Sequence, residues 1–505
     1  MNDTETVLRV QGITKTFGNL IANDAISFSL KKGKVLSLLG ENGAGKTTLM
    51  SIIFGHYTAD DGYIEVFGNK LNASNPAEAI ALGVGMVHQH FTLADNLTVL
   101  ENVILGTEPL WKWTQDKNAG RARLKELSSE FGLHVDPDAD IKSLTVGEKQ
   151  RVEILKALYR GAKILILDEP TAVLTPQETD QLFGTLRDML ARGLSVIFIS
   201  HKLGEVMAIA DDIVVLRHGK LVANFPIAEA SREIIAEKMV GEAVPQPRRQ
   251  IMAIGEELLS VAGVSVKDDS GQEVLKNVSL KLHRHQIIGI AGVSGNGQKP
   301  LSDLIGGMCK PNSGQLQLFG KTVTVFDPKE MIANGIGRVP EDRHAQGVVG
   351  DFSVEENMIM ESYTEPRFSK FGWLRKKAIM AHSKSLISAF DIRGAEPETI
   401  VRGLSGGNMQ KVILARVLAN NPQIILANQP TRGLDVGAAT FVHEQLFEAR
   451  KYGAGVIMIS EDLEELLAVS DSIVVMYHGQ ISPQMAVEDV TLQQLGLLMS
   501  GEGFS

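Results

Sequence analysis

The sequence has one cysteine, Cys309, and no long hydrophobic run. A lone cysteine excludes an internal disulfide and a cysteine-rich zinc site, and it is typical of a small buried residue. The longest apolar stretches are strand-sized, whereas a membrane-spanning helix needs roughly 18 or more apolar residues in succession. The first residues, MNDTETVLRV, lack the basic and then apolar pattern of a secretory signal. We therefore expect a cytosolic chain, unless a partner brings it to a membrane.

Aromatic residues are scarce at 5%, whereas glycine accounts for 49 of 505 residues. This balance favours tight turns and close approaches of the backbone to a ligand. The formal charge of −10 is the opposite of the basic surface that a nucleic-acid scaffold carries. A hydrophobic content of 44% excludes bulk disorder. Because a single core stops growing at roughly 250–300 residues, at least two domains are expected.

The chain contains an internal repeat. Gly40 in LLGENGAGKTT matches Gly292 in IAGVSGNGQKP, 252 positions later. LTVGEKQRV matches LSGGNMQKV at an offset of 260, and ILILDEPT matches IILANQPT at the same offset. Matching landmarks in the same order predict one domain written twice. The predicted boundaries are domain 1 over residues 1–243, a linker with two prolines over 244–257, and domain 2 over 258–505.

Short apolar runs bounded by turn residues dominate each copy, among them KVLSLLG, KILILDEP and LSVIFIS. Continuous runs of this length are typical of strands covered on both faces, so we predict an α/β fold with a largely parallel sheet. Between Phe91 and Ile141 the spacing becomes helical, which indicates a helical insertion. Trp113 and Trp373 lie 260 positions apart within the helical regions. We expect both to pack within the helical subdomain, and the alternative is that they face a membrane partner.

The segment GENGAGKTT lies between a strand-like run and a helical run, which is the context of a P-loop. Glycines let successive backbone N–H groups face phosphate oxygens, and the following helix adds its positive end. Lys46 is expected to reach the β- and γ-phosphates, and the Thr47 hydroxyl to bind Mg²⁺. The predicted nucleotide-binding residues here are Gly40, Glu41, Asn42, Gly43, Ala44, Gly45, Lys46, Thr47 and Thr48.

Two carboxylates end the run ILILDEPT. Asp168 fits a carboxylate that holds Mg²⁺ at the end of a core strand, and Glu169 fits the catalytic group that orients and deprotonates the attacking water. Gln89 and His201 also follow apolar runs, and we assign both to catalysis, with Gln89 also contacting Mg²⁺. Without the other motifs, a loop amide and a capping imidazole would be the preferred interpretations of these two residues.

The segment LSGGNMQ lies at a loop that enters a helix, a geometry suited to anion binding through free N–H groups. P-loop, Gln, LSGG, DEPT and SH in this order resemble an ABC-type ATPase. Two such cassettes in one chain, the second degenerate, resemble the ATP-binding subunit of the simple-sugar and nucleoside ABC importers. GMVHQHF and RVPEDRHAQGVV resemble the nucleoside-importing branch most.

This resemblance implies two tandem P-loop ATPase domains, each with a mostly parallel core sheet, an antiparallel β part and a helical subdomain. It implies ATP and Mg²⁺ as cofactors and places Phe17 where an aromatic ring stacks on adenine, although a core Phe at a strand end is an equal alternative. His88 and His90 receive no catalytic role. Further ATP-binding residues implied by the signature and D-loop motifs are Leu404, Ser405, Gly406, Gly407, Asn408 and Asp435.

The same resemblance implies partners. They are two transmembrane permease subunits and an extracytoplasmic solute-binding protein, with no nucleic acid. The chain is then expected at the cytoplasmic face of the cell membrane as a peripheral subunit. The helical regions after Gln89 and Glu341 are the expected docking surfaces for the permeases.

The two copies differ at the side chains that carry the chemistry. Loss of a general base costs roughly 10²–10⁴ in rate, so hydrolysis at the second copy should be negligible. The glycines of its loop remain, and loss of one charge-assisted contact costs about 1.5–3 kcal/mol, which is compatible with weak nucleotide binding. Lys46, Thr47, Gln89, Asp168, Glu169 and His201 correspond to Gln298, Lys299, Glu341, Asn428, Gln429 and Glu461.

The signature loops are unequal in the opposite sense. The second copy has LSGGN, whereas the first has LTVGE, with Val146 at a glycine position and Glu148 adding negative charge. ABC cassettes pair head to tail, so the intact P-loop of copy one is expected to face the intact signature of copy two. One competent ATP site and one impaired site result.

The sequence thus predicts an ATP hydrolase that powers import of a small polar solute. We expect a nucleoside, with a simple sugar such as ribose or galactose as the alternative. A soluble twin-cassette ATPase acting on ribosomes or nucleic acid is the alternative from another class. It predicts two intact sites and a charged linker, and the degenerate second site and the acidic balance oppose it. A nucleotide sensor without hydrolysis is opposed by Glu169 and His201.

The head-to-tail pairing predicts an ordering of two glycine variants. Gly407→Asp should reduce ATP hydrolysis nearly as much as Lys46→Ala, because the aspartate adds a negative charge beside the phosphates. Gly147→Asp, at the matching place in copy one, faces the impaired site and should be milder. Steady-state ATPase rates, measured together with thermal unfolding, test this ordering. A more damaging Gly147→Asp at equal stability would contradict the pairing.

Overall fold

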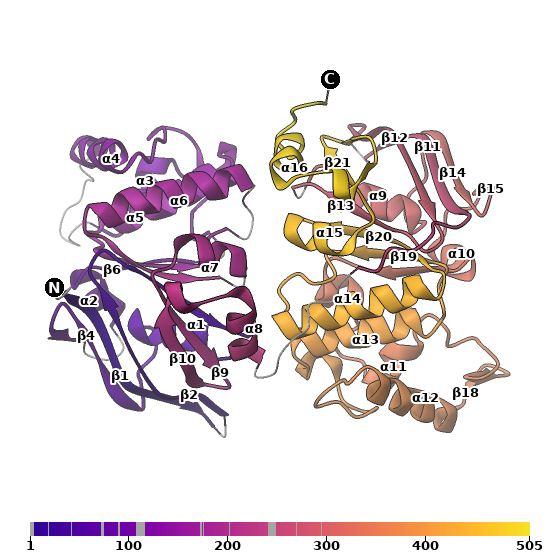
Figure 1. Ribbon diagram of the computed structural model, residues 1–505, viewed down its shortest axis with the longest axis horizontal. Helices are drawn as coiled ribbons and strands as arrows, with labels where there is room; N and C mark the ends of the chain where they lie inside the picture. The colour runs from indigo at the N-terminus through magenta and orange to yellow at the C-terminus, as the bar shows by residue number, and fades with distance from the viewer. Residues whose placement is uncertain are drawn as a thin grey trace. The chain divides into compact units, whose positions relative to one another are not determined.

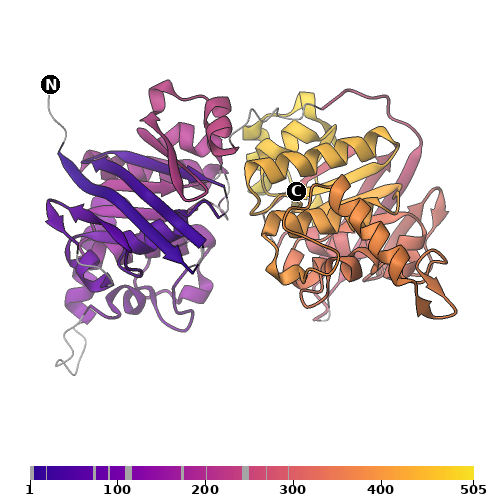
Figure 2. The same cartoon turned by 90° about the horizontal axis from the view of Figure 1, so that it is seen from below.

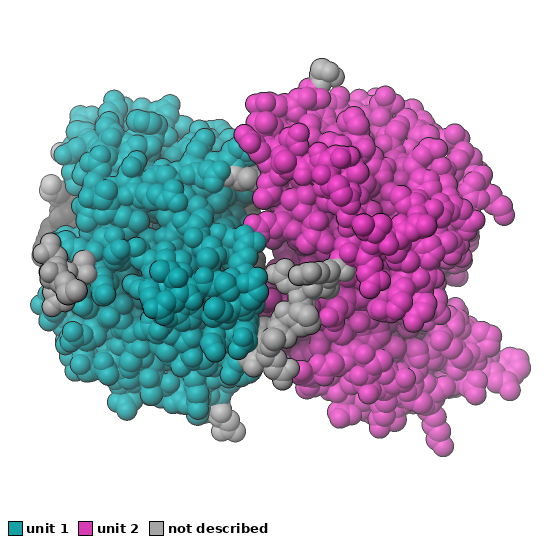
Figure 3. Space-filling view, in the orientation of Figure 1, with its two compact units in different colours: residues 1–244 teal, residues 245–505 magenta. Residues whose placement is uncertain are grey.

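The computed structural model describes residues 5–18, 20–41, 43–71, 75–88, 91–107, 117–171, 174, 176–200, 202–240, 249–268, 270–293 and 295–504. The chain divides into two compact units, Met1–Val244 and Pro245–Ser505 (Figure 3). Much of the first half of the predicted linker therefore lies outside the described residues.

Unit 1 contains two sheets (Figure 1). An antiparallel sheet has the strand order β2-β1-β4-β5, and Figure 2 shows its long indigo strands side by side. The second sheet has the order β10-β9-β3-β8-β7-β6, in which β3, β6, β7, β8 and β9 are parallel and β10 is antiparallel. Its central strands are the apolar runs of the sequence, because strands covered on both faces need no polar side.

The strands and helices of unit 1 have the following bounds. The strands are β1 (Thr6–Phe17), β2 (Leu20–Lys31), β3 (Val35–Gly40), β4 (Asp61–Val66), β5 (Asn69–Lys70), β6 (Val84–Val87), β7 (Ile164–Asp168), β8 (Ser195–Ile199), β9 (Asp212–Arg217) and β10 (Lys220–Pro226). The helices are α1 (Lys46–Ile53), α2 (Pro76–Ala81), α3 (Val99–Ile104), α4 (Lys117–Phe131), α5 (Val146–Tyr159), α6 (Pro176–Ala191), α7 (Leu203–Ile209) and α8 (Arg232–Val240).

Alternate residues of the parallel sheet face two different cores. On β7, Ile164 and Ile166 pack with α1 and the antiparallel sheet, whereas Leu165 and Leu167 pack with α3, α5 and α6. This follows from the period of two along a strand. The helices α3, α4 and α5 pack on one another and form the helical part expected after Phe91. None of the described helices combines the length and the apolar composition that crossing a bilayer requires.

Unit 2 repeats this architecture. Its antiparallel sheet has the order β12-β11-β14-β15, and its larger sheet has the order β16-β19-β20-β13-β21-β22, with β23 paired to β21. The helices α11, α12 and α13 pack together as the second helical part, and β17 and β18 form a separate hairpin. Trp373 on this hairpin is 81% exposed, so the expectation that it packs in the subdomain is wrong. Trp113 lies outside the described residues.

The elements of unit 2 have the following bounds. The strands are β11 (Glu257–Lys267), β12 (Glu273–His283), β13 (Ile287–Ala291), β14 (Ser313–Leu318), β15 (Lys321–Thr322), β16 (Ile336–Val339), β17 (Ser369–Lys370), β18 (Trp373–Leu374), β19 (Ile424–Asn428), β20 (Gly455–Ser460), β21 (Ser472–Tyr477), β22 (Gln480–Ile481) and β23 (Met485–Ala486). The helices are α9 (Gln298–Ile305), α10 (Pro328–Ala333), α11 (Val354–Ile359), α12 (Lys376–Ala389), α13 (Gly406–Leu418), α14 (Val436–Lys451), α15 (Leu463–Val469) and α16 (Leu492–Met499).

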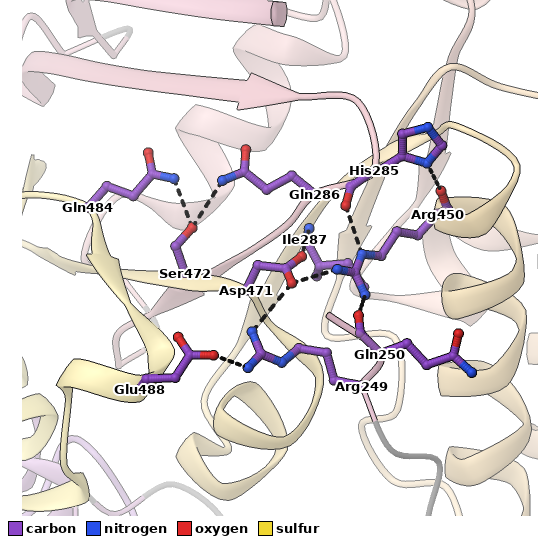
Figure 4. A network of polar contacts seen from close by, with 10 residues as sticks. All are labelled: Arg249, Gln250, His285, Gln286, Ile287, Arg450, Asp471, Ser472, Gln484 and Glu488. Carbon is purple, nitrogen blue, oxygen red and sulfur yellow. Dashed lines mark hydrogen bonds and ion pairs between the residues drawn. The ribbon is translucent and has the colours of Figure 1, made fainter. Parts of the chain in front are cut away.

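A buried ionic network joins distant segments of unit 2 (Figure 4). Arg450, near the end of α14 and 2% exposed, donates to the backbone oxygens of His285 and Gln250, each over 2.8 Å. It also donates to the Asp471 carboxylate over 2.6 Å, and Arg249 lies 3.4 Å from the same carboxylate. Residues 249 and 250 are therefore bonded to unit 2 although they precede its first strand.

We expect Arg450→Met to destabilise unit 2 by about 3 kcal/mol, because it leaves the partly buried Asp471 carboxylate and two carbonyls without this partner. The matched control is Lys281→Met, which removes an exposed ion pair with Glu257 of 2.9 Å and should cost about 1 kcal/mol or less. Urea-induced unfolding measures both. Equal losses would mean that the network contributes no more than a surface pair.

Candidate functional site

The loop between β3 and α1 is shaped by glycines that have no room for a side chain. Gly40 has a φ of 151°, and a Cβ there would lie 2.4 Å from the Leu216 oxygen of β9. Gly45 has a φ of 97°, and its Cβ would lie 2.2 Å from the Ala22 oxygen of β2. The predicted P-loop is thus pressed against two neighbouring strands, which fixes the course of its backbone.

The remaining residues of this loop differ in how far their side chains are exposed. Gly43 has a φ of 83° with open space beside it, and Ala44 is buried and offers its backbone alone. Glu41 and Thr48 are half-buried, whereas Thr47 is exposed on the first turn of α1. Gly45, the residue before the first turn of α1, has no side chain that could cap the helix. Asn42 lies outside the described residues.

Lys46 places its charge inside the loop. Its Nζ donates to the Gly40 oxygen over 2.6 Å and to the Glu41 oxygen over 3.0 Å. The same charge opposes the rise in the pKa of Asp168 that burial causes. A cation beside the positive N-terminal end of a helix forms a site for a multiply charged anion.

Asn23 forms a hydrogen bond to the P-loop of unit 1. It belongs to none of the sequence motifs, so it was not predicted as a site residue. Its side chain is fully buried on β2, and its Nδ2 donates to the Gly45 oxygen over 3.1 Å. The signal in the sequence is an amide in an otherwise apolar strand position. Leu275 occupies the matching place in unit 2, so this hydrogen bond belongs to unit 1.

The two predicted carboxylates end β7. Burial raises the pKa of Asp168, and the neighbouring charge of Glu169 raises it further, whereas Lys46 and His88 oppose this shift. Glu169 has a φ of 47°, and its N–H donates to the Ile199 oxygen over 2.9 Å. A left-handed backbone at a non-glycine residue costs about 1–2 kcal/mol and is typical of functional turns. Gln429 keeps the same turn with a φ of 48°, so unit 2 retains the geometry without the carboxylate.

The structure shows the surroundings of two aromatic residues from the sequence analysis, His88 and Phe17. The sequence assigned no catalytic role to His88, yet it lies close enough to Asp168 to oppose the rise in the pKa of that carboxyl. Its ring stacks on the His56 ring with centroids 6.4 Å apart. Phe17 is 45% exposed at the end of β1 and meets Tyr57 edge-on at 5.6 Å. The alternative of a core phenylalanine is therefore wrong. Gln89, His90 and His201 lie outside the described residues.

Glu205 ties the turn after β7 to the end of β8. The hydroxyls of Thr171 and Ser200 donate to its carboxylate over 2.6 and 2.7 Å, and both residues are buried. Thr171 follows the DEP motif, and Ser200 immediately precedes His201. Unit 2 repeats this arrangement with Glu465, which accepts from Thr431 and Ser460. The sequence motifs did not indicate either glutamate, although each stands five residues after a serine, Ser200 just after β8 and Ser460 at the end of β20.

In the second P-loop, a glutamine side chain forms hydrogen bonds to the backbone of the loop itself. Gln298, at the position of Lys46, is buried, and its Nε2 donates to the Val293 oxygen over 2.9 Å. Its Oε1 accepts the Asn296 N–H over 3.1 Å. The amide therefore uses one of the backbone N–H groups that a P-loop directs at phosphate, and it brings no positive charge.

The two signature loops differ in how their helices begin. In unit 1 Glu148 accepts the Thr145 N–H over 2.8 Å and its hydroxyl over 2.9 Å, so a carboxylate occupies the start of α5. These hydrogen bonds lower the pKa of Glu148, the backbone one most. In unit 2 Ser405 caps α13 by accepting the Asn408 N–H, with no carboxylate at this place.

The other predicted residues of the second signature surround this cap. Leu404 is buried and offers its backbone, and Asp435 caps α14 by accepting the Ala438 N–H over 2.7 Å. A Cβ on Gly407 would lie 3.3 Å from the Ala438 methyl, and one on Gly406 would lie 3.5 Å from the Arg343 guanidinium carbon. Gly147 in unit 1 has less space for a side chain, since a Cβ there would lie 2.9 Å from a Glu178 carboxylate oxygen.

Arg343 adds a cation to this loop that sequence reasoning did not assign. Its guanidinium donates to the Arg432 oxygen over 2.8 Å and lies beside Gly406 and Gly433. Burial and the charge of Arg432 lower its pKa. Arg343 belongs to the VPEDR segment that the resemblance rests on, but the segment alone does not indicate that this side chain contacts the signature loop.

Comparison with known families agrees with this geometry. The family model described as ABC transporter matches residues 23–172 and 275–432, which is more than half of the chain. The chain belongs to the ABC transporter family. ATP binding follows from this membership, and the predicted α/β fold with two tandem P-loop ATPase domains is confirmed.

Similar proteins match this chain over nearly their whole length. The nucleoside import ATP-binding protein NupA of Lactococcus lactis subsp. cremoris is 43% identical, with 98% of each chain covered. The guanosine import ATP-binding protein NupO of Bacillus subtilis is 42% identical, with 98% of each chain covered. The glucose import ATP-binding protein TsgD13 of Haloferax volcanii is 43% identical over 99% of this chain and 96% of its own.

A solved structure shares the fold of the whole chain. It is the archaeal ribosome recycling factor aABCE1 in complex with the ribosomal stalk protein aP1. The TM-score is 0.64 at 19% identity, covering 94% of this chain and 90% of that chain. At this identity the likeness concerns the fold alone.

We expect Glu205→Gln to lower kcat for ATP hydrolysis by roughly tenfold or more, because two charge-assisted hydrogen bonds that hold the turn after Asp168 are weakened. KM for ATP should change little, since Glu205 does not touch the P-loop. The matched control is Glu465→Gln, which weakens the same bonds in unit 2 and should cost stability without lowering kcat. Equal loss of kcat in both variants would refute the positioning role of Glu205.

Proposed function

We propose that this chain is the ATP-hydrolysing subunit of an importer and that its solute is a nucleoside. The observation that carries the hydrolysis is the contrast between the two P-loops. In unit 1 Lys46 puts a cation inside the loop near Asp168, whereas in unit 2 the neutral Gln298 occupies the same loop. Relatives named for nucleoside and guanosine import support the solute.

The residues present fit Mg²⁺. The described residues contain no group of three or more His, Cys, Asp or Glu able to hold a metal ion. Mg²⁺ does not need three such ligands, because it is commonly held by one or two protein oxygens together with substrate phosphates. Thr47 and Asp168 would supply those oxygens. The pKa of the half-buried Asp168 is raised, so a bound cation would stabilise the charged form of this carboxylate. Bound there, Mg²⁺ would neutralise charge on the transferred phosphoryl group.

The protein's own groups supply the rest of the chemistry. The N–H groups of the P-loop and the Lys46 ammonium would stabilise the negative charge that develops on the phosphates. Glu169 would orient the attacking water and accept its proton. Phe17, exposed beside Tyr57, would stack on the adenine ring. The roles of Gln89 and His201 stay predictions.

We also propose the head-to-tail site, in which the signature residues Ser405 to Asn408 complete the site of Lys46. The carboxylate of Glu148 at the start of α5 supports this choice, because it makes the other signature unsuited to phosphate. The proposed partners are two permease subunits and an extracytoplasmic solute-binding protein, and the proposed location is the cytoplasmic face of the cell membrane.

A simple sugar is the second candidate solute, because a glucose import protein is as similar as the nucleoside import proteins. In cells that lack the chromosomal copy, we expect the wild-type chain to restore uptake of labelled guanosine rather than of glucose or ribose. Glu169→Gln should reduce this uptake by roughly 10²–10⁴, because the general base is lost. Gln429→Glu is the matched control and should leave uptake unchanged.

Each outcome has a separate meaning. Uptake of sugar alone would select the second candidate and leave the ATPase assignment intact. Near wild-type uptake with Glu169→Gln would contradict the assignment of the general base. No uptake of any solute, with normal ATP hydrolysis, would favour the alternative of a twin-cassette ATPase outside transport.

A further inference from the structure

The hairpin of β17 and β18 exposes two aromatic rings. Lys370 pairs with Trp373, and Phe371 and Gly372 form the two-residue turn between the strands. Phe371 is 91% exposed and Trp373 is 81% exposed. Figure 1 places β18 at the outer edge of the ribbon of unit 2, beside α12. Adjacent exposed aromatic rings on one small element indicate a contact surface.

The backbone of the turn adds to this indication. Phe371 has a φ of 51° and Gly372 a φ of 81°, and positive φ at both central residues is characteristic of a type I′ turn. Asn-Gly and Asp-Gly are the preferred pairs in such turns, whereas a bulky residue at positive φ is a conformational outlier. One residue therefore combines a disfavoured backbone with an exposed aromatic ring, and strain of this kind is typical of functional positions.

The hairpin is firmly attached, so its exposed tip is not a loose loop. Phe368, immediately before β17, is 2% exposed and packs with Ile359 and Ile379. Its ring lies 4.9 Å from the ring of His382 on α12. The Arg375 N–H donates to the Phe368 oxygen over 2.8 Å, which closes the base of the hairpin.

Cations surround the aromatic tip. The segment of residues 366–377 contains no carboxylate, although the whole chain carries −10. The nearest acidic residue along the chain, Glu365, forms an ion pair with Arg367 over 2.6 Å. All the cations of the segment are exposed, and they are Arg367, Lys370, Arg375, Lys376 and Lys377.

We propose that this hairpin binds the headgroup region of an anionic lipid bilayer. Trp rings favour the membrane–water interface, and basic residues near the surface are attracted to anionic headgroups. Phe371 and Trp373 enter the interface. The lipid phosphates are met by the four cations of the segment other than the ion-paired Arg367, namely Lys370, Arg375, Lys376 and Lys377. This contact goes beyond the proposed function, because it needs neither a permease nor a nucleotide.

Vesicle sedimentation with the full-length chain alone tests the proposal. We expect binding to vesicles of equal parts phosphatidylcholine and phosphatidylglycerol, weakened by salt, and little binding to phosphatidylcholine alone. Phe371→Asn combined with Trp373→Thr should lower the partition coefficient about tenfold or more. Tyr452→Thr is the matched control, since it removes a ring that is also 81% exposed but lies at the end of α14, and it should leave binding unchanged.

The design separates binding from folding and from catalysis. Phe371→Asn creates the Asn-Gly pair that the turn prefers, so Tm should not fall while binding is lost. Glu169→Gln should bind vesicles as the wild type does, so failure of the ATPase assignment would not affect this result. Equal partition of the wild type and the double variant would overturn the proposal. Sedimentation that requires permeases in the vesicles would also overturn it, and would assign the hairpin to a protein partner.

Discussion

The absence of space for a side chain at Gly40 and Gly45 is the constraint on which the site of unit 1 depends. The oxygens of Leu216 and Ala22 approach the loop so closely that the backbone itself becomes the binding surface. The loop joins a central strand to α1, so the sheet and the helix hold it from both sides. Lys46 and Asp168 are then brought together although 122 positions separate them in the sequence.

The second unit demonstrates that this backbone can be kept while the chemistry is lost. Gly292 and Gly297 have φ values of 155° and 118°, close to those of their counterparts, and Gln429 keeps the turn of Glu169. What changes is charge: an amide replaces the ammonium, and amides replace both carboxylates. A fold can tolerate such exchanges because its stability rests on apolar strands and buried turns rather than on the catalytic groups.

The sequence predicted the repeat, the parallel sheets and the motifs, because continuous apolar runs and short motifs are formed by neighbouring residues and recur in the same order in both copies. It did not predict Asn23 or Glu205, since their partners come from other elements and a single Asn or Glu carries no motif. The sequence also did not predict which side chains of the helical regions are buried. Periodicity located Trp373 near a helix, but the two-residue turn that exposes it is a property of local backbone geometry.

The cap at the start of α5 has a consequence for how the first signature could regain its binding capacity. Returning glycine to position 146 would remove the branched side chain but leave the Glu148 carboxylate bonded to Thr145. Neutralising Glu148 alone would free the N–H groups but leave Val146 beside them. Neither substitution is sufficient, so the repair requires two simultaneous changes. The asymmetry of the two units is thereby protected against reversal by single mutations.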